Sequence, residues 1–283
     1  MTIFEENLKT LSAFYPQMDK LIEEAKEEFE PELEVVEEAA YDGDRIIKIK
    51  KEDRVCYLNG KRNTEEPAKI WRETVGELAA NSPVFLMGLG NPAYLKELSE
   101  QSKDRLAIFI YEPSFQIFID FLEHVPLKRW MEKHLIVFWV KGIEGMDDKA
   151  MRGLVEKILR YETIPHYRKL ILPNYDVLFP EEALAFLKMI NECMSSEIVN
   201  YMTQMRFSTV TIKNLLDNVK YLCDGYKTTH LVDVIPRDIP GIVVAAGPSL
   251  NKNIQELKKA KGKAFIVAVD TAIKPLIAAG IIP

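Results

Sequence analysis

The sequence predicts an α/β fold in which a parallel sheet is covered by helices on both faces. Apolar runs at residues 83–87, 106–111 and 135–140 alternate with segments whose apolar residues recur at helical spacing. Strands that are buried on both faces are apolar throughout, and their alternation with helices is typical of parallel sheets. The chain has 283 residues, of which 47% are hydrophobic and 28% are charged, as in ordinary folded proteins. We therefore expect one α/β domain with further structure on either side of it.

Residues 1–81 are expected to form a small α+β region in front of this domain. The first forty residues hold twelve acidic side chains and three lysines. Met18, Ile22 and Phe29 share one face at helical spacing, which predicts an amphipathic helix. Its acidic face is either a docking surface for a basic partner or an ordinary solvated face.

A small antiparallel meander is expected at residues 33–62. Three β-rich runs are separated by Asp42-Gly43 and closed by Asn59-Gly60. Both dipeptides are typical of tight hairpins, because the central positions of a type I′ turn require positive φ.

A Rossmann-like domain with trailing helices is expected over residues 82–235. A fourth strand is predicted near residues 167–173, and two helices are predicted within residues 181–222. The second of these helices carries an apolar face. Its apolar residues are Ile212, Leu215, Leu216, Val219 and Leu222.

The alternation of strand and helix begins again after Pro236 and Pro240. Two strands and two helices are predicted within residues 236–283. Such a set cannot bury both faces of a parallel sheet. We therefore expect residues 236–283 to be the start of a second α/β domain, truncated at Pro283, and the chain to be the front part of a longer protein.

A first glycine turn follows the strand at residues 83–87. Gly88 and Gly90 form the turn, and the next strand ends at Glu112. In nucleotide-binding α/β units, glycine lets the backbone approach the ligand, and the acid accepts from a ribose hydroxyl. These residues are either a vestigial site for a cofactor such as S-adenosylmethionine or a dinucleotide, or a tight strand–helix turn without a ligand.

A second glycine turn has the same order of parts. Gly247, Pro248 and Ser249 follow a strand, and the next strand ends at Asp270, with Thr271 beside it. Gly247 would permit close approach of the backbone to a phosphate, and it could also require a φ that other residues avoid.

The second turn also carries a family resemblance. "AAGPSL" at residues 245–250 and "VAVDTA" at 267–272 resemble the nucleotide-sugar-binding domain of the motility-associated-factor glycosyltransferases. That family also covers proteins similar to 6-hydroxymethylpterin pyrophosphokinases, and its "GPSL" turn is similar to one in bacterial sialyltransferases. "FLMGLGNPAYLKEL" and "IFIYEPS" look like the family's amino-terminal Rossmann-like domain, so the resemblance covers most of residues 80–283.

The resemblance implies a function and a set of site residues. Family members transfer a nonulosonic acid, a relative of sialic acid, from a CMP-activated donor to Ser or Thr of flagellin. Gly247, Pro248 and Ser249 would lie against the nucleotide, and Asp270 with Thr271 would meet a ribose hydroxyl or orient a neighbouring donor. The alternative for Ser249 is a helix N-cap, and for Asp270 a carboxylate that caps the helix from Thr271.

Two departures from the family pattern affect this expectation. "GLGNP" stands where family members more often have further glycines, which weakens a ligand role for the first turn. The catalytic base is expected after Pro283, so we expect this part of the protein to be inactive alone.

Three functions from different classes remain open. The leading expectation is a cytoplasmic bacterial glycosyltransferase with a CMP-activated nonulosonic acid as donor and flagellin or another flagellar protein as acceptor. The alternatives are a pterin-type diphosphokinase, which would need ATP and Mg²⁺, and a non-catalytic module that binds a flagellar protein. No cofactor is implied beyond the sugar donor, and the need for a divalent metal is left open.

Composition argues against several other classes. The net charge is −6, whereas proteins that bind nucleic acids usually carry an excess of basic residues. The longest apolar run has six residues, so no membrane partner is expected. The four histidines have no zinc-ligand spacing, and the three cysteines are expected to be reduced.

Overall fold

The computed structural model describes residues 1–31, 33–41, 43, 45–51, 54–58, 60–80, 82–225 and 227–283. These residues divide into two compact units, Met1–Arg206 and Phe207–Pro283. The division falls within one long helix, α9 (Pro180–Asp224). The domain limits expected from the sequence, 1–81, 82–235 and 236–283, stay predictions.

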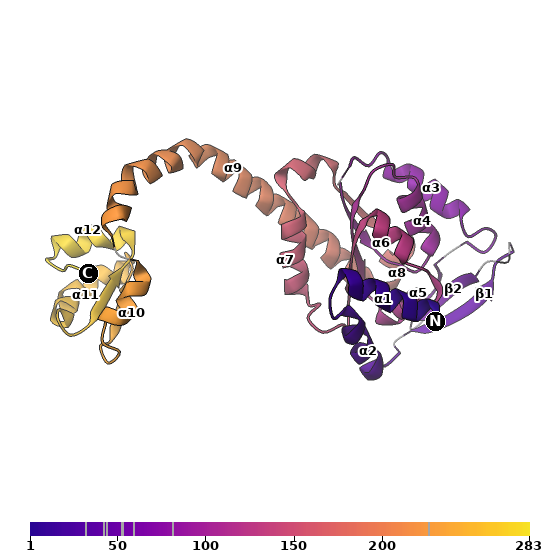
Figure 1. The fold of residues 1–283 in the computed structure, drawn as a ribbon, viewed down its shortest axis with the longest axis horizontal. Helices are drawn as coiled ribbons and strands as arrows, with labels where there is room; N and C mark the ends of the chain where they lie inside the picture. The colour runs from indigo at the N-terminus through magenta and orange to yellow at the C-terminus, as the bar shows by residue number, and fades with distance from the viewer. Residues whose placement is uncertain are drawn as a thin grey trace. The chain divides into compact units, whose positions relative to one another are not determined.

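A four-stranded parallel sheet lies at the centre of the first unit (Figure 1). The strand order is β6-β5-β4-β7, which confirms the predicted α/β fold. Its strands are β4 (Pro83–Met87), β5 (Ala107–Glu112), β6 (Leu135–Val140) and β7 (Arg168–Ile171). The chain builds β5 and β6 outward on one side of β4 and then returns to its other side for β7. The strand order therefore reverses at β4, where α/β sheets usually bind their ligands.

Helices cover both faces of this sheet. Phe118 of α5 packs on Phe138 of β6, with ring centroids 5.8 Å apart, on one face. On the other face, Phe186 of α9 stacks on Tyr111 of β5 at 5.5 Å. The helices of this unit besides α9 are α1 (Ile3–Phe14), α2 (Met18–Glu28), α3 (Glu66–Val75), α4 (Pro92–Glu100), α5 (Phe115–His124), α6 (Lys128–Lys133), α7 (Asp148–Ile158) and α8 (Tyr175–Leu178).

Polar caps set the starts of the helices that follow the sheet strands. Asn91 accepts a hydrogen bond from the N–H of Ala93, Ser114 from Ile117, and Asp147 from Ala150. Each cap satisfies one of the N–H groups that lack a partner in the first helical turn. The sequence therefore determines where α4, α5 and α7 begin.

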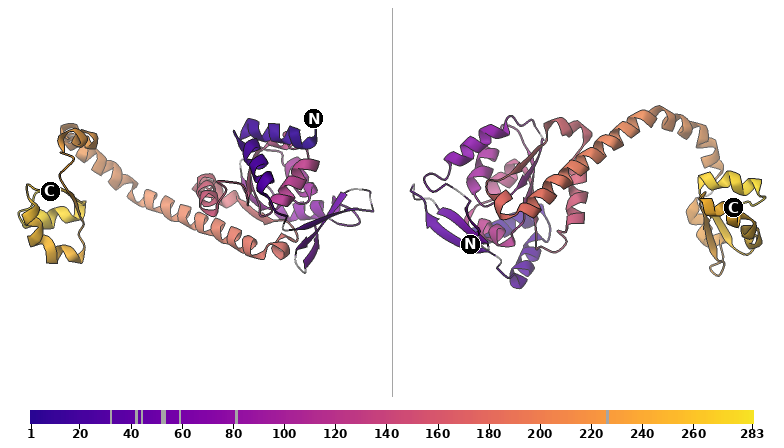
Figure 2. Two further views of the ribbon diagram at one scale, coloured as in Figure 1. Left: turned by 90° about the horizontal axis from the view of Figure 1, so that it is seen from below. Right: turned by 180° about the vertical axis from the view of Figure 1, so that it is seen from behind.

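The predicted meander is confirmed as a separate antiparallel sheet. It consists of β1 (Glu34–Ala39), β2 (Arg45–Lys51) and β3 (Arg54–Tyr57), paired in that order (Figures 1 and 2). The buried side chains of Ile47 and Ile49 join the core of the first unit. Asp42 and Asn59, the expected turn residues, lie outside the described residues.

The acidic amino-terminal segment forms two helices, α1 and α2, packed on the first unit (Figure 2). Met18 and Ile22 are buried, as their spacing predicts. Asn7 of α1 is also buried and holds the link between α5 and α6. Its Nδ2 donates to the carbonyls of Leu122 and Val125 at 2.8 Å, and its Oδ1 accepts from the N–H of Leu127 at 2.9 Å.

The prediction of two helices within residues 181–222 is wrong. The structure has the single helix α9 there, with 45 residues. Residues 181–224 contain neither glycine nor proline, so no residue in this stretch interrupts the backbone hydrogen bonds of the helix.

The second unit has a two-stranded parallel sheet with helices after each strand. Its elements besides α9 are α10 (Leu231–Val234), β8 (Gly241–Val244), α11 (Pro248–Leu257), β9 (Phe265–Ala268) and α12 (Asp270–Ala278). Val244 and Ile266 contribute to a small core, whereas the register pair Val243 and Val267 is exposed. Across both units, no helix that the structure describes has the length and apolar character needed to cross a membrane.

We expect Asn7→Ala to lower the free energy of unfolding of the first unit by about 2–4 kcal/mol, because three buried backbone groups lose their partner. Urea unfolding followed by tryptophan fluorescence measures this, since Trp71, Trp130 and Trp139 all lie in this unit. Lys9→Ala, an exposed change in the same helix, should stay within about 0.5 kcal/mol of the wild type. Equal midpoints for Asn7→Ala and the wild type would contradict the role assigned to Asn7.

Candidate functional site

The first glycine turn lies where the strand order reverses. Gly88 continues β4, and its N–H donates to the carbonyl of Tyr111 in β5 at 2.9 Å. Its φ is +109°, in the region that favours glycine. Glu112 follows Tyr111, so the glycine and the acid are neighbours across the two strands.

The side chain of Tyr175 fills this turn. Its hydroxyl accepts hydrogen bonds from the N–H groups of Leu89 at 3.0 Å and Gly90 at 2.9 Å, and it donates to Glu112 Oε2 at 2.7 Å. The ring lies so close to Gly88 that a Cβ there would be 2.6 Å from it. The backbone N–H groups and the carboxylate that a nucleotide would contact are thus already paired within the chain.

Glu112 is fully buried. Burial raises its pKa to about 8, against the opposing effect of hydrogen bonds from Tyr175, Ser114 and Leu89. Burial also raises the pKa of Tyr175 well above its usual value. The pair is therefore an internal polar contact, and its carboxyl group does not face solvent.

The second glycine turn has open space at its glycine. Gly247 is the N-cap of α11, and a Cβ there would meet only Ser249 Oγ among the described atoms, at 3.8 Å. Its φ is −80°, so the expectation of a φ that other residues avoid is wrong. The extended backbone places Pro248 at the first position of the helix, and this geometry does not require glycine.

Ser249 and Asp270 are both exposed. Ser249 lies inside the first turn of α11, so the alternative role as N-cap belongs to Gly247 instead. Asp270 is the first residue of α12, and its Oδ1 accepts from the N–H of Thr271 at 2.7 Å. A carboxylate with one such bond keeps lone pairs for further donors.

Gly247 and Asp270 both follow the carboxyl ends of the paired strands β8 and β9. Val244 is in register with Ala268, and the N–H of Val269 donates to the carbonyl of Val244 at 3.0 Å. The turn at Gly247 and the start of α12 at Asp270 therefore follow neighbouring strand ends. This is the edge at which parallel sheets bind nucleotides.

Known proteins resemble both units of the chain. A family model described as 6-hydroxymethylpterin diphosphokinase MptE-like matches residues 213–283. The solved structure of a MAf glycosyltransferase from Magnetospirillum magneticum AMB-1 matches 99% of this chain, with a TM-score of 0.50 and 15% sequence identity. The predicted family resemblance is confirmed. At this identity, the likeness to the solved structure is one of fold.

This chain covers 48% of the length of that glycosyltransferase. No curated protein matches the sequence. The MptE-like segment, residues 213–283, contains the open turn at Gly247 together with Asp270, whereas the filled turn at Gly88 lies outside it.

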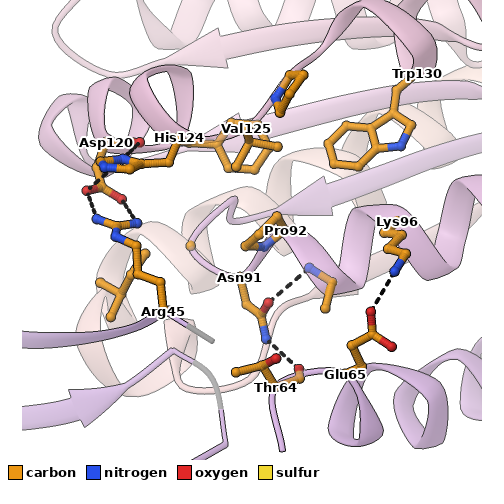
Figure 3. A pocket seen from close by; sticks show the side chains of 15 residues that line it. Arg45, Thr64, Glu65, Asn91, Pro92, Lys96, Asp120, His124, Val125 and Trp130 are labelled. Carbon is orange, nitrogen blue, oxygen red and sulfur yellow. Dashed lines mark hydrogen bonds and ion pairs between the residues drawn. The ribbon is translucent and has the colours of Figure 1, made fainter. Parts of the chain in front are cut away.

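A cavity of about 360 Å³ lies in the first unit near the start of α4 (Figure 3). On one side, Arg45 of β2 points at Asp120 of α5, with one hydrogen bond at 3.0 Å, and it also donates to Glu37 at 2.8 Å. Burial lowers the pKa of Arg45, but the bonds to Asp120 and Glu37 raise it by a larger amount. The pKa therefore lies well above its usual range. The guanidinium is therefore permanently charged.

Asp120 and His124, which line this cavity, and the neighbouring Glu37 could together hold a metal ion, since their ligand atoms lie within 4.8 Å of one another. Arg45 already donates to both carboxylates, so a metal ion would have to displace it. The arrangement favours a salt-bridged cluster over a metal centre.

Sequence analysis did not identify Tyr175 or Arg45. Tyr175 reaches Gly88 because β7 pairs with β4, and strand order is not visible in a pattern of apolar runs. One signal was present, because Pro173-Asn174-Tyr175 follows a strand end, where α/β proteins place functional loops.

We expect the free energy of unfolding of the first unit to fall as the pH rises from about 5 to about 8. The pKa of the Glu112 carboxyl is near 4.5 in the unfolded chain and about 8 in the folded protein. Between these pH values the unfolded chain therefore binds fewer protons than the folded one. The contribution should reach about 1.4 kcal/mol per pH unit. The glutamine in Glu112→Gln cannot titrate, so this variant should lose that contribution to the pH dependence. Urea unfolding at a series of pH values measures it.

Glu132→Gln, an exposed change, is the control and should keep the wild-type slope. If Glu112→Gln also keeps that slope, the pKa of Glu112 is not raised in the folded protein and the prediction fails.

Proposed function

We propose that residues 241–283 bind the nucleotide of an activated sugar and that the chain is part of a glycosyltransferase. The observation that supports this most strongly is the contrast between the two turns. The turn at Gly247 is open beside an exposed Asp270, while Tyr175 occupies the turn at Gly88. Only the open turn has space for a ligand's phosphate close to the backbone.

Each residue of the open turn has a role in this proposal. Gly247 lets the backbone approach a phosphate, and the N–H and hydroxyl of Ser249 donate to its oxygens, since Pro248 has no N–H and that of Leu250 already donates to the carbonyl of Gly247 at 2.9 Å. Pro248 holds the helix start in its required φ. Asp270, with Thr271 beside it, accepts a hydrogen bond from a ribose hydroxyl.

The reaction proposed is transfer of a sugar from a CMP-activated nonulosonic acid to a protein hydroxyl. The bond between the anomeric carbon and the phosphate oxygen breaks, and a new bond forms from that carbon to the acceptor oxygen. CMP leaves with the electron pair, and the hydroxyl proton passes to a base. Donors at the turn stabilise the charge that develops on the leaving phosphate. The donor and the acceptor, a Ser or Thr of flagellin, come from the family resemblance.

A pterin diphosphokinase is the second candidate, favoured by the description of the family model that matches residues 213–283. Diphosphoryl transfer from ATP needs Mg²⁺ held by carboxylates. Among the described residues, the grouping that could hold a metal is Glu37, Asp120 and His124, which lies outside the MptE-like segment. The transferase is therefore the better-supported function.

Calorimetric titration with CMP and with Mg-ATP distinguishes the two functions. We expect CMP to bind and Mg-ATP not to bind. Asp270→Ala should weaken CMP binding at least about tenfold, or 1.4 kcal/mol, through loss of a hydrogen bond from the ribose. Glu112→Gln should change it by less than about threefold. The reverse order of effects would place the nucleotide at the first turn.

Gly247→Val should abolish measurable CMP binding and leave thermal unfolding unchanged. The backbone at Gly247 accepts any residue and the protein has room for a Cβ, so the added side chain obstructs only a ligand. Gly241→Val, in the same unit and with nothing within 4 Å of its Cβ, is the matched control and should bind CMP normally. Unchanged affinity in Gly247→Val would mean that the turn is purely structural.

A further inference from the structure

The carboxy-terminal part of α9 has an apolar face that the other described residues of the second unit leave exposed. Ile212, Leu216 and Val219 are 43–67% exposed, and the flanking Leu215 and Leu222 are exposed to a similar degree. Exposed apolar residues gathered along one face of a helix indicate an interaction surface.

The spacing of these residues is that of a coiled coil. Thr209, Ile212, Leu216, Val219 and Cys223, here called the seam, are separated by three, four, three and four residues. This is the heptad repeat, with Thr209, Leu216 and Cys223 at a and Ile212 and Val219 at d. In the sequence, the same spacing continues upstream through Met205, Met202 and Ile198, which are also exposed.

The surface of α9 has a groove of the kind that a coiled-coil contact requires. A groove of about 350 Å³ is lined by six residues, of which four are Thr209, Ile212, Lys213 and Leu216 and the other two are Ser208 and Asp217. Those four residues occupy positions a, d, e and the next a. In a parallel coiled coil, a set of four residues of this kind forms the hole that receives a d-position side chain of the facing helix.

Charge at the flanking positions favours a parallel pair of identical helices. The e positions are Lys213 and Lys220, and the g positions are Ser208, Leu215 and Leu222. In a parallel pair, e faces g of the other helix, so each lysine meets a neutral side chain and can lay its stem along it. An antiparallel pair would place the lysine-bearing e positions opposite each other.

We propose that α9 forms a parallel, in-register coiled coil with α9 of a second copy of this chain, through the seam. Ile212, Leu216 and Val219 then each pack against the same residue of the partner chain. The contact is symmetric and closes on itself, as in most homodimers. This proposal is independent of the nucleotide site.

Sedimentation equilibrium of the whole chain under reducing conditions, from about 1 to 100 µM, tests the proposal. We expect the mass of a dimer. Leu216→Glu should raise the dissociation constant at least about tenfold, because it places two carboxylates in one buried layer. Asn214→Glu, on the opposite face of the same helix turn, is the matched control and should stay within about threefold. Far-UV circular dichroism verifies that both variants remain folded.

Cys223 tests the orientation separately. In a parallel, in-register pair it lies beside Cys223 of the partner chain, and copper phenanthroline with oxygen should convert the two thiols to one disulfide, with two electrons passing to the oxidant. Cys223→Ser should prevent this, because Cys193 is buried and Cys56 half-buried. A monomer at 100 µM, a dimer insensitive to Leu216→Glu, or a dimer that does not cross-link through Cys223 would each overturn the proposal.

Discussion

The hydroxyl of Tyr175 joins the ends of three neighbouring strands. It accepts from two backbone N–H groups of the loop after β4, donates to the acid at the end of β5, and itself follows β7. All of these groups are buried, so each would carry a desolvation cost without its partner. The first unit therefore has the strand order of a Rossmann-like sheet, and the turn at the end of β4 is filled by the side chain of Tyr175.

The two glycine turns show how neighbours determine what one motif can do. Both follow a parallel strand, both precede a helix that begins with proline, and both lie beside an acid at the next strand end. Glu112 is buried, its pKa is raised by that burial, and it accepts hydrogen bonds from three internal donors, whereas Asp270 is exposed beside an open turn. Of the two acids, Asp270 is the one that keeps contact with solvent, which any contact with a ligand would require.

Most of the fold was predictable because it depends on local patterns. Apolar runs predicted β4, β5 and β6, and turn dipeptides predicted the antiparallel meander, since these signals act within a few residues. The continuity of α9 was missed although no residue interrupts it. The site was harder to predict, because the contact of Tyr175 with Gly88 spans distant residues and depends on strand order. The φ of Gly247 was also misjudged, since its motif allows either conformation.

The packing of Tyr175 on Gly88 has a consequence for how related sequences are compared. Gly88 has to remain glycine because the aromatic ring lies against it, whether or not any ligand has ever bound there. Retention of a glycine fingerprint among homologues would then report an internal contact and give no indication of cofactor use. Covariation would supply the distinguishing signal, because a homologue with a small residue at the position of Tyr175 would have open space at this turn and a β5 acid without that internal partner.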